Sequence, residues 1–301
     1  MNPSEITVLD AGMGKALMMR GVEIPKTIWS ANALIVAPDE VKRVHLENID
    51  AGARLITTNS YGIVKTDLAK VNIESQYSQL NELAGQLAQL AVAEREVAVE
   101  IAGSLPPLTG SYRPDRVLQR HLLENLYLEQ AILLAPYVDL LLCETLSSIA
   151  EGLAAASAAQ KCGKPLLVSF TLHDTHKNKL RSGESLQDAI HQLKDMNVLG
   201  VLVNCCLPER ISDAMPLLAK SGLPFRGGYA NSFTRVPEDW LLDGNKETDG
   251  LLTMRDDLSP HNYCRFVSQW IDEGANIVGG CCGTTAEHTK AIAELVAKTP
   301  E

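Results

Sequence analysis

The sequence lacks the features that direct a chain into a membrane, through a secretory pathway or onto nucleic acid. None of its apolar stretches approaches the roughly 18 residues that a membrane span requires. The N-terminus, residues 1–5, has neither the basic segment nor the apolar run of a signal peptide. The net charge is -10 and no basic patch is present. We therefore expect neither nucleic acid nor a membrane as a partner.

The number of cysteines bears on where the protein is located in the cell, and the composition bears on how many domains it has. There are seven cysteines, an odd number, and no secretion signal. Thiols in such a chain are typical of the reducing cytoplasm, where we expect this protein. With 301 residues, 46% of them hydrophobic, the chain can bury a large core. No linker, repeat or low-complexity tract divides it, so we expect one domain over residues 1–301.

Short apolar runs alternate with stretches of helical periodicity along the whole chain. The predicted strands cover residues 6–9, 54–59, 97–103, 138–144, 166–170, 199–204, 225–230 and 275–278. The predicted helices cover residues 38–52, 73–95, 118–134, 147–161, 186–196, 209–220, 261–273 and 286–297. Eight alternations in about 300 residues predict an α/β protein with a single (β/α)8 TIM barrel, and a doubly wound sheet is the alternative.

One long irregular segment, residues 231–259, interrupts this alternation after the seventh predicted strand. In a barrel, the segments that follow the strands lie on the catalytic face. Long loops without secondary structure are commonly lids or binding loops. We therefore expect residues 231–259 to act as a lid or a substrate loop.

The most unusual stretch is Gly279-Gly280-Cys281-Cys282-Gly283, directly after the eighth strand. Glycines on both sides let the backbone turn sharply and bring two sulfurs toward one point. Adjacent cysteines are poorly suited to a structural disulfide, whereas two converging thiols suit a soft metal such as zinc. A third ligand is available from Cys205 or Cys206, and periodicity cannot choose between them because both faces of a barrel strand are buried.

Other interpretations of the cysteines stay open at this point. Buried cysteine usually just fills space, which we expect of Cys143, Cys162 and Cys264. A structural or sensory zinc protein would close its site with a fourth ligand such as Cys206. A redox protein would use the adjacent pair after the eighth strand, although that pair lacks the Cys-x-x-Cys spacing that tunes such thiols.

Polar side chains end several predicted strands, where the active site of a barrel lies. Asp10 follows the first strand and Glu144 ends the fourth. These carboxylates can orient a charged substrate, but Asp10 can equally cap a helix and Glu144 can form a buried salt bridge. Asn204 ends the sixth strand, where it can hydrogen-bond a ligand sulfur or only satisfy the strand end.

These pieces together resemble the zinc-dependent homocysteine S-methyltransferase family, which includes betaine–homocysteine and S-methylmethionine–homocysteine methyltransferases. The similar segments occur in the family's order and span nearly the whole chain. They are residues 9–14, 51–61, 143–145, 203–205 and 279–284. The resemblance implies a TIM barrel, in agreement with the independent strand count. It also implies a zinc enzyme that methylates homocysteine to give methionine.

The resemblance also implies which residues bind the metal. It selects Cys205, rather than Cys206, as the zinc ligand beside Cys281 and Cys282. A free thiol is only a few per cent ionised at neutral pH, and zinc coordination deprotonates it. Three protein thiolates leave a fourth, substrate thiolate electron-rich, so homocysteine sulfur could attack the methyl group of a cationic donor in line.

The substrate residues that the resemblance implies are Asp10 and Glu144 for the amino group of homocysteine. Its carboxylate would meet the backbone amides of Ala11 and Gly12. The family usually has glycine at the position of Ala11, which is a departure that bears on this contact. Residues 231–259 match nothing in the family that can be carried over.

The expected donor is a small sulfonium, with S-methylmethionine favoured and S-adenosylmethionine next. One barrel uses up the 301 residues, and we expect neither further cobalamin modules nor the C-terminal region of the betaine enzymes. A cation could meet carboxylates and aromatic faces in the irregular segment, or those residues could form a solvated turn. They are Asp239, Trp240, Asp243, Asp256 and Asp257. A related thiol or selenol methyltransferase is an alternative activity.

Overall fold

Eight parallel strands form the centre of the molecule. The computed structural model describes residues 1–299. The strands are β1 (Thr7–Val8), β2 (Leu55–Thr57), β3 (Glu100–Leu105), β4 (Leu140–Leu146), β5 (Leu166–Phe170), β6 (Gly200–Asn204), β7 (Phe225–Ala230) and β8 (Ile277–Gly280). Each overlaps one of the eight predicted strands, and β5 and β7 have the predicted ends.

The strands close into a barrel, as the sequence predicts. Their order is β1-β8-β7-β6-β5-β4-β3-β2, and all seven neighbouring pairs are parallel. A parallel bridge between Leu9 and Leu55 joins the first strand to the second. The amide of Asp10 donates to the Leu55 carbonyl at 3.0 Å across the same junction. The (β/α)8 TIM barrel is therefore confirmed.

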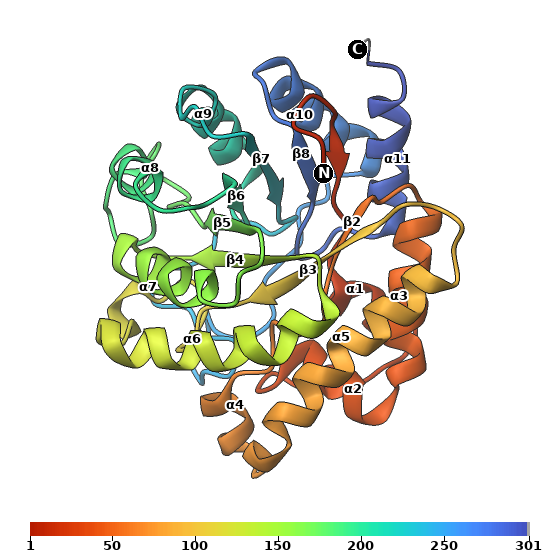
Figure 1. Ribbon diagram of the computed structural model, residues 1–301, viewed down its shortest axis with the longest axis vertical. Helices are drawn as coiled ribbons and strands as arrows, with labels where there is room; N and C mark the ends of the chain where they lie inside the picture. The colour runs from red at the N-terminus through yellow and green to blue at the C-terminus, as the bar shows by residue number, and fades with distance from the viewer. Residues whose placement is uncertain (300–301) are drawn as a thin grey trace.

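Helices surround the strands (Figure 1). Those that correspond to predicted helices are α3 (Pro38–Asp50), α5 (Tyr77–Ala93), α6 (Arg120–Leu134), α7 (Ile149–Gln160), α8 (Leu186–Lys194), α9 (Pro208–Ala219), α10 (Pro260–Asp272) and α11 (Ala286–Val296). Three others were not predicted: α1 (Met13–Met19), α2 (Asn32–Val36) and α4 (Lys65–Lys70). They have five to seven residues, too few for a helical period to stand out.

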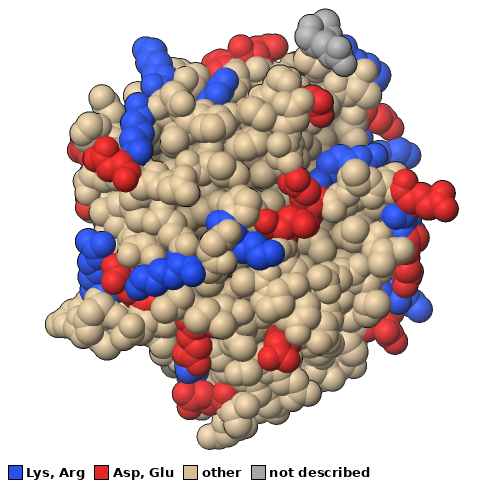
Figure 2. All heavy atoms as spheres, viewed as in Figure 1, with Lys and Arg blue, Asp and Glu red and all other residues tan. Residues whose placement is uncertain are grey.

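The hydrophobic core has two concentric parts. The barrel interior is filled by side chains such as Leu142, Leu167 and Leu202, while a larger layer lies between the strands and the helices. Both faces of each strand are consequently buried, as is usual for parallel sheets. Within residues 1–299, no helix has the length and apolar character needed to cross a bilayer. Basic and acidic side chains are interspersed on the face in Figure 2.

Candidate metal and substrate site

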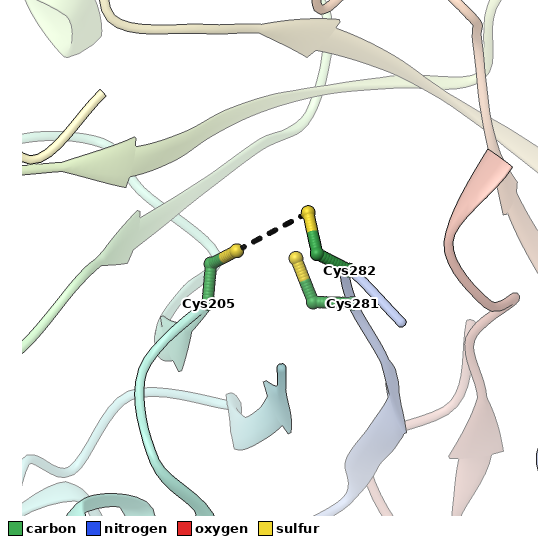
Figure 3. Close-up of side chains that lie close together, drawn as sticks. All are labelled: Cys205, Cys281 and Cys282. Carbon is green, nitrogen blue, oxygen red and sulfur yellow. Dashed lines mark hydrogen bonds between the residues drawn. The ribbon is translucent and has the colours of Figure 1, made fainter. Parts of the chain in front are cut away.

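Three sulfurs converge at the C-terminal ends of β6 and β8. The ligand atoms of Cys205, Cys281 and Cys282 lie within 4.8 Å of one another, and the Sγ atoms of Cys205 and Cys282 are 3.7 Å apart. Figure 3 shows the three side chains pointing toward a common point. Cys206, fully buried, belongs instead to the layer between strands and helices. The fold thus brings one cysteine of the 205–206 pair to the 281–282 pair.

The intervening strand β7 fixes the two cysteine segments relative to each other. The amide of Cys205 donates to the Tyr229 carbonyl at 3.0 Å, and the amide of Cys281 donates to the Ala230 carbonyl at 2.9 Å. Cys205 itself has a left-handed backbone, with φ 50°, so its side chain leaves the alternation of the strand. A Cβ on Gly12 would lie 2.6 Å from the Cys281 carbonyl oxygen, so only glycine allows this approach.

The three thiols do not have equal acidity. Interactions with the Cys281 and Cys282 thiols hold the pKa of Cys205 well below that of an ordinary thiol, and the Tyr112 hydroxyl lowers it further. The pKa values of the other two cysteines are raised through the same mutual interactions and through burial. The three thiols therefore titrate as one coupled group, in which hydrogen bonds from two thiols stabilise the thiolate of the third.

Two buried carboxyl groups face the same cavity as the sulfurs. Asp10 accepts a hydrogen bond from the Thr57 amide at 2.9 Å, and burial raises its pKa to about 8. Glu144 accepts hydrogen bonds from the hydroxyls of Ser104 and, at 3.0 Å, Tyr229. Burial raises the Glu144 pKa to about 7. The negative charge of Glu144 also contributes to the high pKa of Asp10, so the two groups titrate as a pair.

These carboxylates have no protein cation to compensate them. Within residues 1–299, neither Asp10 nor Glu144 forms a salt bridge with lysine, arginine or histidine. Among these residues, the buried salt bridge that was the alternative role of Glu144 is therefore absent. Asp10 does not cap α1, because the N-terminus of this helix has no side-chain cap hydrogen bond. Both residues are under 8% exposed and line a cavity of about 760 Å³ together with Cys205, Cys281 and Cys282. The two buried carboxyl groups are therefore available to pair with a cationic group of a ligand.

The backbone of Ala11 and Gly12 also lines this cavity. The Ala11 amide already donates to the Asn48 side chain at 3.1 Å. The Gly12 amide donates to the Thr284 hydroxyl at 3.4 Å, a longer bond that a carboxylate can replace more easily.

The side chain of Asn204 is hydrogen-bonded to residues of β4 and β5, and none of its hydrogen bonds goes to a sulfur. Its Oδ1 accepts from the Thr145 amide at 2.9 Å and from the Ser169 hydroxyl at 2.7 Å. Its Nδ2 donates to the Thr145 hydroxyl at 2.8 Å. Thr145 has φ 60°, which is unusual for a β-branched residue. Asn204 therefore holds the irregular part of β4 that contains Glu144 and Thr145.

The irregular segment contributes part of the cavity wall. Trp240 and Asp243 line it, whereas the other acidic candidates of the segment do not. Asp239 instead pairs with Lys246, and Asp257 pairs with Arg255. Asp239, Asp256 and Asp257 are exposed and lie in turns, which was the alternative interpretation. A lysine of α4 joins Asp243 to the opposite wall: Lys70 contacts Asp243 at 2.7 Å and Asp67 at 2.8 Å.

Sequence reasoning missed one residue at the cluster of three thiols. Tyr112 lies in the loop after β3, and its hydroxyl donates to Cys205 Sγ at 3.0 Å. No period or spacing marks this loop, so only the tertiary structure identifies Tyr112. Tyr61 and Tyr229, at or near the ends of β2 and β7, also line the cavity.

The whole barrel, and not only the site, matches a known family. The sequence model described as homocysteine S-methyltransferase matches residues 7–296. The chain belongs to the homocysteine S-methyltransferase family. It is 30% identical to Homocysteine S-methyltransferase 1 of Arabidopsis thaliana, over 95% of this chain and 91% of that protein. It is 27% identical to the Homocysteine S-methyltransferase of Escherichia coli strain K12, over 97% of this chain and 96% of that protein.

A solved member of the homocysteine S-methyltransferase family has the same architecture. The crystal structure of the E. coli homocysteine methyltransferase MmuM, in its metallated form, matches with a TM-score of 0.80 and 26% identity. The match covers 97% of this chain and 96% of that one. Membership confirms the resemblance seen in the sequence and makes this protein an enzyme whose reaction is methyl transfer to homocysteine. The non-catalytic and redox interpretations are not favoured.

Proposed function

We propose that this enzyme uses zinc, held by Cys205, Cys281 and Cys282, to transfer a methyl group from a small sulfonium donor to homocysteine. The observation that carries the proposal is the convergence of three thiols and two uncompensated carboxyl groups on one cavity. The thiols fit a soft divalent metal in number and chemistry. When bound, zinc would hold the substrate thiol as a thiolate at neutral pH and leave it nucleophilic.

The protein's own groups orient the acceptor. Asp10 and Glu144 bind the ammonium group of homocysteine. Its positive charge offsets the free-energy cost of keeping the two ionised carboxylates buried. The substrate carboxylate lies against the backbone of Ala11 and Gly12. The family usually has glycine at the position of Ala11. The methyl group of alanine leaves less space for the carboxylate, but the backbone amide of this residue is still present. Asn204 supports the arrangement indirectly by fixing Thr145, the neighbour of Glu144 in the irregular part of β4.

Methyl transfer then needs no proton from the protein. The substrate sulfur forms the new S–C bond while the S–C bond of the sulfonium donor breaks. The electron pair of the broken bond stays with the donor sulfur, which leaves as a neutral thioether. The carboxylates therefore act by binding and orienting the substrate, and orientation lowers the entropic part of the barrier.

The outer part of the cavity supports a donor that carries both signs of charge. Its aromatic wall includes Trp240, whose ring can meet a sulfonium cation. Asp67, Lys70 and Asp243 line the same cavity and can accommodate an ammonium and a carboxylate. S-methylmethionine has these three charges on a small frame, so we favour it over S-adenosylmethionine.

A donor panel tests the proposal directly. The enzyme is incubated with homocysteine and each of S-methylmethionine, S-adenosylmethionine, betaine and methylcobalamin, and methionine is quantified. We expect the largest kcat/KM with S-methylmethionine. Turnover with betaine alone would refute the sulfonium assignment.

Metal content tests the ligand set separately from the donor. We expect one zinc per chain, lost in C205A, C281A and C282A but retained in C206A, which is the matched control because Cys206 is buried in the outer core layer. Loss of zinc in C206A would show that the ligand set is wrong.

A further inference from the structure

Tyr112 combines three unusual features at the metal site. Its hydroxyl donates to Cys205 Sγ at 3.0 Å, its side chain is buried, and its backbone has φ 63°. A left-handed conformation in a bulky residue costs on the order of 1–3 kcal/mol and persists only where surrounding contacts determine it. Such strain is commonly found at functional sites. The contacts that hold this phenol therefore bear on what it does.

Two neighbours fix the Tyr112 ring. The guanidinium carbon of Arg181 lies 4.9 Å from the ring centroid, and Arg181 is itself anchored by Asp174 at 3.0 Å. The side chains of this ion pair are only 4% and 2% exposed. Trp240 packs against the ring in an edge arrangement, with centroids 5.5 Å apart. The irregular segment and a buried ion pair thus aim one hydroxyl at one sulfur.

The position of this hydrogen bond matters because a metal–thiolate site holds several nucleophiles. In the proposed enzyme, the sulfurs of Cys205, Cys281 and Cys282 lie beside the substrate sulfur, and each thiolate can react with an electrophilic methyl group. A hydrogen bond withdraws electron density from the sulfur that accepts it and lowers its nucleophilicity. The attraction between the Arg181 guanidinium and the ring keeps the phenol in this position.

We propose that Tyr112 protects Cys205 from methylation, so that the methyl group is directed to the substrate sulfur. The proposal rests on the proposed function. In the reaction that is suppressed, Cys205 Sγ would form an S–C bond to the methyl carbon while the donor's S–C bond breaks. The donor would leave as a neutral thioether, and Cys205 would become a neutral methyl thioether and a poor zinc ligand. Tyr112 thus acts through Cys205, as a positioning residue that favours methylation of the substrate sulfur over methylation of the cysteine.

The test compares Tyr112→Phe with the wild-type zinc enzyme. Both are treated with methyl iodide in the absence of homocysteine, and methylation of each cysteine is followed by peptide mass spectrometry. We expect Cys205 to be methylated roughly ten- to a hundredfold faster in Y112F, as follows from loss of a hydrogen bond to a charged group. In the wild-type enzyme, Cys205 should be the slowest of the three zinc ligands to react.

Tyr127→Phe is the matched control. Tyr127 is a fully buried tyrosine of α6, and its hydroxyl has no hydrogen-bond partner among the described residues. Y127F should therefore show wild-type methylation. In cobalt-substituted protein, the thiolate-to-cobalt charge-transfer band should shift in Y112F and not in Y127F, because only the former changes a ligand sulfur.

The outcomes separate the inference from the function on which it rests. Equal methylation of Cys205 in the wild type and Y112F, in enzyme that binds zinc and forms methionine, would overturn the inference alone. Fast methylation of Cys205 in the wild type, relative to Cys281 and Cys282, would also overturn it, without recourse to any variant. Wild-type protein that binds no zinc would overturn both.

Discussion

Binding of the acceptor amino group by Asp10 and Glu144 should release protons. In the free enzyme, burial raises the pKa of Asp10 to about 8 and that of Glu144 to about 7, so at pH 6 both groups are largely protonated. An ammonium group binds the ionised pair, and the complex therefore holds fewer protons than the free components. Affinity should consequently rise with pH and level off once the pH passes about 8.

The magnitude follows from linkage. One released proton makes binding tenfold tighter per pH unit, about 1.4 kcal/mol, below the pKa of the group concerned. Between pH 5 and 7, where Asp10 is mostly protonated, affinity should thus rise by about a hundredfold if one proton is released. A second proton, released by Glu144, should make the rise in affinity steeper at the acid end of this pH range. D10N removes one titrating group, so its pH dependence should be shallower and its affinity weaker.

L-methionine is the appropriate ligand for this assay, because it has the ammonium and carboxylate groups but no thiol proton. Isothermal titration calorimetry in buffers of different ionisation enthalpy counts the protons released. Glu151→Gln is the matched control: Glu151 is a buried carboxyl whose pKa is also raised to about 7, but it does not line the cavity. An unchanged proton count in D10N, or loss of zinc from D10N, would refute the assigned role.

Two further predictions concern residues away from the ligand itself. N204A removes the hydrogen bonds that fix Thr145, so homocysteine affinity should fall by roughly tenfold or more while zinc stays bound; full affinity in N204A would argue against this support of Glu144. Burial without hydrogen-bond partners lowers the pKa of His45 from 6.5 to about 4. The free energy of unfolding should therefore fall by up to about 3 kcal/mol between pH 6.5 and pH 4 because of His45. Above pH 6.5 this histidine should have no effect on it. Urea unfolding of H45L should lack this component, and an identical pH profile would contradict it.

The barrel and the chemical character of the site could both be predicted from the sequence alone. Buried strands are continuous apolar runs, and the helices between them keep a clear period, so local pattern and tertiary role agree. The Gly279–Gly283 motif was equally informative, because two adjacent thiols flanked by glycines have few uses other than a metal. Asp10 and Glu144 were accessible to the same reasoning, since the end of a parallel strand fixes where its next residue lies.

Only the tertiary structure could decide contacts between segments far apart in the chain. Cys205 faces the other thiols because its backbone turns to φ 50°, a conformation that strand periodicity cannot reveal. Asn204 reaches Thr145 across the intervening strand β5, and Tyr112 reaches Cys205 from a loop without any period. In residues 231–259, Trp240 and Asp243 face the cavity while Asp239 does not, because the path of an irregular segment is set by what it packs against. Strands and helices repeat a local geometry that a sequence can record, whereas these contacts depend on how the whole chain folds.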